Sequence, residues 1–326
     1  MRLNERVSEL GRRLIGALAG SALLLAAQPS FAEASAPVAA SAPGPRSAAA
    51  AEPRPAIWLL EDEDTRIYLF GTTHMFERGL AWRSARLDAI VREADELVME
   101  TADEDEIDPA AFVDSMFMDK SVPILSRVSE GYRPQLQRIV EASDLEPEIW
   151  DRMQTWAAAI AVMGTLMMEG MTEEQRASAD PFEAMMSGAE VELTEEFRRA
   201  GKPISAVETS DFQMNMLRTL SRPAQQAFLE STLEDAERAA AGDSEDVDQP
   251  WVRGDVEAIA REMESMPPSL YEPLLTDRNR SWTEWLERRL ERPGTVLFAV
   301  GAGHLAGRDS VQSMLAARGL TARRID

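Results

Sequence analysis

The chain contains only two histidines among its 326 residues, and each stands three residues after a glycine that ends an apolar run. The two motifs are Gly71-Thr-Thr-His74 and Gly301-Ala-Gly-His304. A short apolar run predicts a buried strand, and a glycine at its end allows a sharp turn or the close approach of another group. Imidazole is the commonest metal ligand and is well suited to proton transfer near neutral pH. The pair predicts one polar site, although each histidine could instead only cap its strand with a hydrogen bond.

Carboxylates follow two further apolar runs. Glu100 ends the run at 96–100, and Glu208 ends the run at 204–208, with Gln213 on the helix expected next. Ligands bind at the carboxyl ends of strands in sheets with helices on both faces, so both glutamates are candidates for the same site. Alternatively, Glu100 is an ordinary exposed residue and Glu208 only holds the sheet edge. Arg278 could pair with an anionic group or a developing oxyanion, or could lie on the surface of a charged helix.

The elements that must position these residues are short strands and helices. Strands are expected at 57–60, 66–72, 96–100, 204–208, 296–304 and 320–325, the first two as a hairpin with an acidic turn. Helices are expected at 80–94, 109–171, 190–200, 222–241, 251–263, 267–290 and 307–318. The uncharged run at 154–168 is too short for a membrane span, so it predicts a buried core helix or a methionine-lined groove. Distant strands must meet in one sheet, with the largely helical middle segment forming a cap.

The N-terminal residues 1–32 have the pattern of a secretory signal peptide. Four arginines precede an apolar run at 14–27, and Ser30-Phe31-Ala32 resembles a signal cleavage site. We therefore expect export across the inner membrane and a periplasmic location, or a membrane anchor if the segment stays uncleaved. No transmembrane segment is expected after its removal. Residues 33–54 are rich in Ala, Pro and Ser and predict a disordered linker. Residues 55–326 predict one domain with a helical insertion at about 105–200.

The composition argues against several kinds of function. The formal charge of −23 argues against a nucleic-acid partner, because phosphates would be repelled. The chain has no cysteine, which excludes a thiol nucleophile, a disulfide and a cysteine-ligated zinc. Hydrophobic residues make up 44% of the chain, which is enough to build a core without such cross-links.

The ordered set of motifs resembles the TraB/GumN family, to which the Tiki proteases also belong. The matching pieces are Tyr68–His74, Glu100, Gly201–Thr209 with Gln213, Trp251 with Gly254-Asp255, Asp277-Arg278-Asn279, Ala299–Gly307 and Leu315–Gly319. The resemblance implies an α+β fold with a mixed central β-sheet flanked by helices, similar to the erythromycin-esterase and ChaN-like group. In Tiki proteins the paired motifs and a glutamate are required for metal-dependent proteolysis. The chain departs from the family at Glu190, where aspartate is usual, so Glu190 is not part of the expected site.

Three functions remain open at this point. In the first, the chain is a metal-dependent hydrolase acting on a peptide or small ester. His74 and His304 bind Mn²⁺, Co²⁺ or Zn²⁺, Glu100 is a third ligand or the general base, and Arg278 stabilises an oxyanion with Asn279 positioning it. In the second, a metal-free esterase-like hydrolase uses one histidine as general base. In the third, a non-catalytic periplasmic protein binds haem, a metal or a peptide signal, as resemblance to ChaN and TraB proteins allows.

Overall fold

The computed structural model describes residues 52–74, 76–77, 79–102, 113–143, 145–170, 186–240 and 248–326. The expected signal peptide at 1–32, and the linker at 33–54 except for its last three residues, lie outside this part of the chain. Among the described residues, no helix is both long and apolar enough to cross a membrane.

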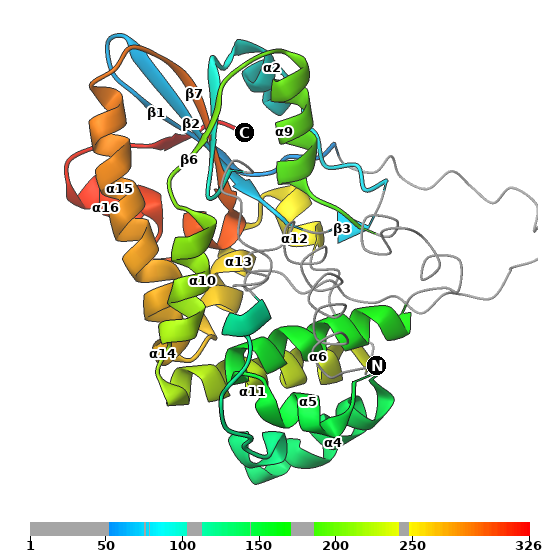
Figure 1. Ribbon diagram of the computed structural model, residues 1–326. Coiled ribbons are helices and arrows are strands. Elements are labelled where there is room, and N and C mark those ends of the chain that lie inside the picture. Colours follow the sequence, from blue (N-terminus) through cyan, green and yellow to red (C-terminus); the bar gives the residue numbers. More distant parts are fainter. Residues whose placement is uncertain are drawn as a thin grey trace, which may run out of the picture.

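A six-stranded mixed sheet forms the centre of the fold (Figure 1). Its strand order is β6 (Ile204–Ala206), β4 (Glu96–Met99), β7 (Gly294–Gly301), β2 (Thr65–Thr72), β1 (Ile57–Glu61) and β8 (Arg323–Arg324). The strands β1 and β2 form the expected antiparallel hairpin, and β8 adds to β1 in antiparallel orientation. The strands β2, β7, β4 and β6 are all parallel to one another. Together with the flanking helices, this sheet confirms the predicted α+β fold.

Alternate residues along each strand pack into two separate hydrophobic cores, because successive side chains point to opposite faces of a sheet. Phe70 and Leu297 belong to one core, and their neighbours Leu69 and Phe298 belong to the other. Helices on the first face are α2 (Ala85–Glu93), α9 (Ala189–Arg199), α12 (Asp248–Arg253) and α13 (Val256–Glu264). Helices on the second face are α15 (Asp277–Leu290) and α16 (Val311–Ala317). Both faces are therefore covered, which leaves the strand ends as the place for a site.

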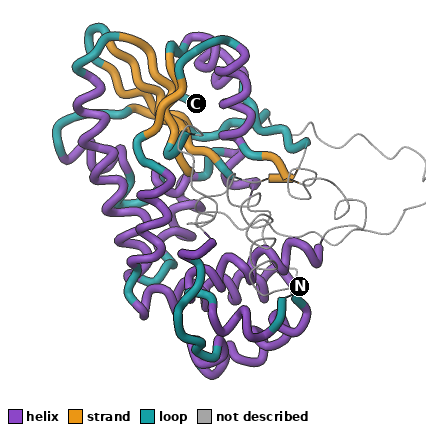
Figure 2. Tube along the Cα trace, viewed as in Figure 1, coloured by secondary structure: helices purple, strands orange, loops and turns teal. Residues whose placement is uncertain are grey.

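A third core lies in a helical layer away from the sheet (Figure 2). Its helices are α4 (Arg133–Ala142), α5 (Pro147–Arg152), α6 (Thr155–Gly170), α10 (Ser210–Thr219), α11 (Arg222–Ala240) and α14 (Pro268–Tyr271). The uncharged run at 154–168 is a core helix, since Trp156 and Ala157 are fully buried. Met153 and Met163 are also buried. The helix α9 falls within the expected insertion at about 105–200, yet it packs against the sheet.

The long helix expected at 267–290 contains an irregular turn. The helices α14 and α15 follow each other through η3 (Glu272–Thr276), which is a π-helical turn. Such turns occur frequently at functional sites, and this one ends two residues before Arg278. The remaining elements are short: the pair β3 (Phe76–Glu77) and β5 (Met186–Ser187), and the turns η1 (Ile124–Arg127), η2 (Glu130–Tyr132) and η4 (Ala302–Leu305).

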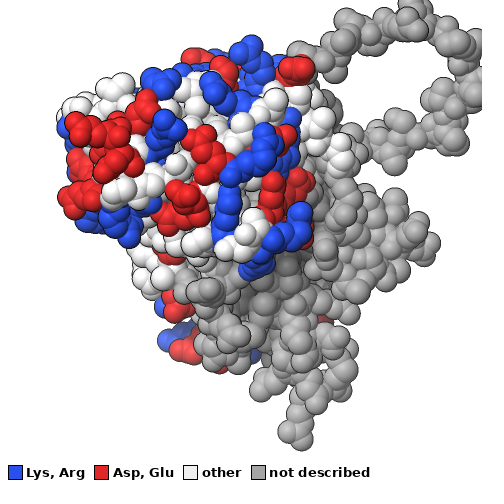
Figure 3. All heavy atoms as spheres, turned by 90° about the horizontal axis from the view of Figure 1, so that it is seen from above, with Lys and Arg blue, Asp and Glu red and all other residues white. Residues whose placement is uncertain are grey.

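The charges on the face of the molecule seen in Figure 3 are mixed, with acidic and basic side chains next to one another. On this face the acidic surplus of the chain is therefore not gathered into one continuous patch.

Candidate functional site

The carboxyl ends of the four parallel strands bring the polar residues of the sequence motifs to one edge of the sheet. Thr72 pairs with Gly301 in the register of β2 and β7. Met99 pairs with Ala299 on one side and with Ala206 on the other. The chain leaves the sheet just after these positions on each strand. The functional candidates that follow at this edge are His74, Glu100, Glu208 and His304.

Two glycines, Gly71 and Gly301, allow other groups to pack closely against the backbone at this edge. A Cβ atom added to Gly301 would stand 3.2 Å from Glu100 Oε1, 3.6 Å from His304 Cδ2 and 3.8 Å from His74 Nε2. These three side chains therefore surround Gly301, whose N–H donates to Glu100 Oε1 at 2.8 Å. A Cβ atom on Gly71 would stand 2.9 Å from a Cα atom of the second motif. Both motif glycines are thus needed because other groups approach their backbones closely.

His304 lies between one hydrogen-bond acceptor and one donor. The side-chain NH₂ of Asn279 donates to the backbone oxygens of His304 at 3.3 Å and Asp309 at 2.8 Å, so its oxygen faces His304 Nδ1 at 2.6 Å. An amide oxygen only accepts, so Nδ1 carries the proton and Nε2 accepts from Arg278 Nη1 at 3.0 Å. Burial, followed by the positive charge of Arg278, lowers the pKa of His304 to about 3, so this ring is neutral.

His74 is paired with a carboxylate. Its Nδ1 lies 2.9 Å from Glu190 Oε1, and the hydroxyl of Thr72 donates to the same carboxylate. Burial works to lower the pKa of His74, but the charge and hydrogen bond of Glu190, helped by Glu100, outweigh it and raise the pKa to about 9. The two histidines thus occupy opposite environments: His74 is protonated at neutral pH and His304 is not.

The position of Glu190 was missed by reasoning from the sequence. The helix α9 begins immediately after Gly188, where an added Cβ atom would stand only 2.3 Å from the carbonyl oxygen of His74. The N–H of Ala189 donates to the carbonyl of Thr73 at 3.1 Å. The start of α9 therefore packs directly on the first motif and carries Glu190 into the site. The sequence signals were a glycine before the helix and the position at which Glu190 replaces the aspartate usual in the resembling family, and neither reveals which strand end the helix meets.

Arg278 is the buried cation of the site, with its side chain only 3% exposed. Its Nε donates to Glu208 Oε1 at 2.9 Å, and Nη2 donates to Glu208 Oε2 at 2.8 Å and to Glu100 Oε2 at 2.5 Å. Its Nη1 contacts His304 Nε2 at 3.0 Å and the carbonyl of Leu274 at 3.3 Å. All five N–H donors of Arg278 are thus used within the protein. Its expected role toward an oxyanion stays a prediction.

The charge of Glu100 is fixed by these neighbours. Burial would raise the pKa of the Glu100 carboxyl, but Arg278 above all, with His304 and His74, holds that pKa far below its usual range. Glu100 is therefore a carboxylate at neutral pH. One of its oxygens faces Arg278, and the other faces the Gly301 N–H beside the two imidazoles.

Glu208 and Gln213 complete the network around the guanidinium. Glu208 accepts from Trp282 Nε1 at 2.8 Å and from Gln213 Nε2 at 2.9 Å, in addition to its contacts with Arg278. Gln213 Nε2 also donates to Glu100 Oε2 at 3.2 Å. The other amide atom, Gln213 Oε1, is buried and has no hydrogen-bond partner within the described part of the chain. The structure thus places Glu208 and Gln213 in the site with the histidines.

Trp282 is a second site residue that the sequence reasoning did not find. Its ring centroid lies 4.3 Å from that of His304 and 4.7 Å from the guanidinium carbon of Arg278. The signal available was its spacing, because residues four apart lie on the same face of a helix. Trp282 stands four residues after Arg278 in α15 and so shares its face.

The donor chemistry of the site fits a divalent transition-metal ion. Each imidazole has its Nδ1 on an oxygen acceptor, Glu190 for His74 and Asn279 for His304. This pattern is typical of metal-binding histidines, whose outer nitrogen is held by a hydrogen bond. His304 Nε2 lies 3.9 Å from Glu100 Oε1. Among the described residues, no three His, Cys, Asp or Glu side chains are already grouped around one ion position.

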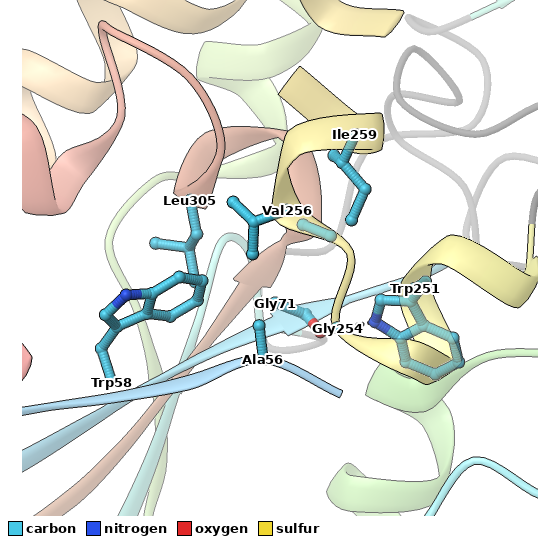
Figure 4. Close-up of a pocket in the computed structure, with 9 residues that line it drawn as sticks. Ala56, Trp58, Gly71, Trp251, Gly254, Val256, Ile259 and Leu305 are labelled. Carbon is cyan, nitrogen blue, oxygen red and sulfur yellow. Dashed lines mark hydrogen bonds between the residues drawn. The ribbon is translucent and has the colours of Figure 1, made fainter. Parts of the chain in front are cut away.

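A small cavity lies behind the first motif (Figure 4). Its volume is about 10 Å³, roughly the space of one water molecule. Its lining is apolar and includes Trp58, Trp251 and Leu305, and it contains no titratable side chain. Trp251 instead positions the motif, because its Nε1 donates to the carbonyl of Gly71 at 2.8 Å. The cavity is too small for a substrate and belongs to the packing that supports the site.

Comparison with known proteins gives one family match. The model of the TraB/PrgY/gumN family matches residues 56–324. Two relatives are the uncharacterized protein YbaP of Escherichia coli (strain K12) and the uncharacterized protein YbaP of Shigella flexneri. Each is 24% identical to this chain over 266 residues, which cover 80% of this chain and 92% of the relative. No solved structure gives a significant match.

Proposed function

The chain belongs to the TraB/PrgY/gumN family, and we propose that it is an exported metal-dependent hydrolase whose metal ion is held by His74, His304 and Glu100. The observation that carries this proposal is the orientation of the two imidazoles. Each Nδ1 is bonded to an oxygen outside the centre. His74 Nε2 faces the space around Gly301 that Glu100 also faces, and His304 Nε2 lies 3.9 Å from Glu100 Oε1. Two imidazole nitrogens and one carboxylate are a donor set used by catalytic zinc sites.

The residues around the donors would keep them in place. Asn279 fixes the tautomer of His304, so that its Nε2 presents a lone pair. Glu190 does the same for His74, which would have to release its Nε2 proton on binding a cation. The N–H of Gly301 holds Glu100 in position. A divalent ion such as Mn²⁺, Co²⁺ or Zn²⁺ would supply Lewis acidity and lower the pKa of a water molecule toward 7.

The substrate class and the location are part of the same proposal. A peptide or a small ester is a suitable substrate, because both have a carbonyl that a Lewis acid polarises. The arginines and the apolar run within residues 1–32 support export to the periplasm. The formal charge of −23 continues to argue against a nucleic acid as partner.

The test is metal content together with hydrolysis. Protein purified without chelators should contain near-stoichiometric metal by mass spectrometry, and His74→Ala and His304→Ala should lose it while keeping wild-type circular dichroism. Exposed carboxylates of an acidic chain could themselves hold metal ions, so the matched control removes one of them. This control is Glu195→Ala, because the Glu195 side chain is 64% exposed. The control should keep both the metal and any activity against ester and peptide libraries. A fully active His304→Ala enzyme would refute the proposal.

A metal-free hydrolase is a second candidate, and one specific contact favours it. The guanidinium of Arg278 already bonds to Glu100 Oε2 and to His304 Nε2. Its positive charge therefore balances the negative charge of Glu100 without a metal ion. In such an enzyme a histidine would act as general base and accept a proton from the attacking water. Activity that survives thorough chelation and dialysis would support this candidate over the first.

A further inference from the structure

We propose that Arg278 and a divalent metal ion compete for the same two donors, Glu100 and His304, so that Arg278 weakens the binding of metal at this site. The inference rests on the proposed metal site and concerns how the protein controls it. Substitution of a residue in a metal site usually weakens metal binding, and here the opposite is expected. Removing Arg278 should tighten metal binding.

The competition follows from which atoms Arg278 contacts. A metal ion would need the lone pair of His304 Nε2, and Arg278 Nη1 donates to that atom at 3.0 Å. Arg278 Nη2 also donates to Glu100 Oε2 at 2.5 Å, the shorter of its two carboxylate contacts at that nitrogen. A nitrogen lone pair accepts only one partner. The guanidinium of Arg278 therefore has to move away from His304 Nε2 before a metal ion can bind to that atom.

Charge adds to this direct competition. Arg278 is 3% exposed, and two like charges a few ångströms apart repel strongly when water is largely excluded. The carboxylate of Glu100 would have to balance both cations at once. A metal ion held by Glu100 therefore gains less from that carboxylate while the guanidinium stays beside it.

The structure also explains why Arg278 does not simply move away. Glu208 accepts three hydrogen bonds from the guanidinium, through both of its oxygens. Glu208 is itself held by Trp282 Nε1 and Gln213 Nε2. Glu208 thus holds the guanidinium of Arg278 in the site. This gives the buried carboxylate of Glu208 a role distinct from that of a metal ligand.

The test needs a variant that removes the guanidinium without stranding Glu208, while Glu100 keeps the N–H of Gly301 as a donor. Arg278→Met alone would strand Glu208 in the interior, which is strongly destabilising. The double variant Arg278→Met/Glu208→Gln removes both charges together, so the net charge of the chain is unchanged. Arg280→Met is the control for the loss of an arginine from α15, because the Arg280 side chain is 54% exposed. Circular dichroism and urea unfolding establish that each variant is folded.

The experiment is a calorimetric titration of MnCl₂ and of ZnCl₂ into chelator-treated, dialysed protein. We expect the double variant to bind metal with a Kd at least about 10-fold lower than that of the wild type, and Arg280→Met to bind like the wild type. His304→Gln added to the double variant should abolish the gain. Tight binding by the wild type with equal or weaker binding by the double variant would overturn the inference and leave the metal site standing.

The remaining outcomes separate the two proposals as well. If the wild type does not bind metal but the double variant does, Arg278 blocks the site, the inference stands, and the metal-dependent function of the wild type is refuted. If neither protein binds either ion, both proposals are refuted.

Discussion

The two histidines of the chelator-treated protein should titrate about six pH units apart. His74 should have a pKa of about 9 and His304 a pKa of about 3, although both begin from the same ordinary value of 6.5. The cause is their different partners. His74 pairs with Glu190, whereas His304 is buried beside Arg278 and needs its Nε2 lone pair to accept from that guanidinium.

The effect on stability follows from the direction of each shift. The pKa of His74 is raised on folding, so its contribution is fully present below pH 6.5 and is lost as the pH rises through 9. That contribution is about 3 kcal/mol, reduced somewhat because the His74 side chain is 21% exposed. The pKa of His304 is lowered on folding, so its contribution is present above pH 6.5 and is lost as the pH falls toward 3. These two groups together favour folding near neutral pH.

The assay is nuclear magnetic resonance of the imidazole nitrogens as a function of pH. The chain has only two histidines, so His74→Gln assigns both signals. In Glu190→Gln the pKa of His74 should fall toward 6.5 or below, because the desolvation remains and the countercharge is gone. The control Glu195→Gln lies on the same helix but is exposed, and should leave both values unchanged. Two histidines that both titrate near 6.5 in the folded wild type would refute this account of the site.

Three further predictions concern stability, measured by urea unfolding of the chelator-treated protein. Arg278→Met should cost about 3–5 kcal/mol because it strands buried carboxylates, whereas Arg280→Met should stay within about 0.5 kcal/mol; equal effects would contradict this. Gly301→Ala should destabilise the fold by at least about 1 kcal/mol, since its Cβ would press on the site carboxylate; an unchanged midpoint would count against the crowding. Trp251→Phe should lose about 1–3 kcal/mol because it removes the buried hydrogen bond from Trp251 Nε1 to the Gly71 carbonyl, and a cost below about 0.5 kcal/mol would show that this bond is dispensable.

Local signals in the sequence were sufficient for most of the secondary structure. The hairpin of β1 and β2 follows from two apolar runs around an acidic turn, and the structure pairs Leu59 with Tyr68 in that hairpin. The burial of α6 follows from the uncharged run at 154–168, which makes up most of that helix. The π-helical turn before Arg278 was missed, although Pro273 within it was an available signal, because a proline interrupts the hydrogen bonds of a regular helix.

The members of the site were predicted in part. The glycine–histidine motifs indicated His74 and His304 because each motif is a local feature, complete within four residues of the chain. Strand ends indicated Glu100 and Glu208 for the same reason. Trp282 could have been found from its helical spacing to Arg278, whereas the carboxylate that pairs with His74 could not be found from spacing.

The sequence by itself determined which residues are able to do chemistry and that they stand at the ends of buried strands. Only the tertiary structure decided which of them face each other. Glu190 reaches a histidine 116 positions earlier in the chain, and Arg278 reaches Glu100 across 178 positions. Such contacts depend on which strands are neighbours and where each helix begins, and those choices are made by burial of the whole apolar surface. The same packing gives one histidine a countercharge and the other a cation, so tertiary structure also sets their opposite protonation states.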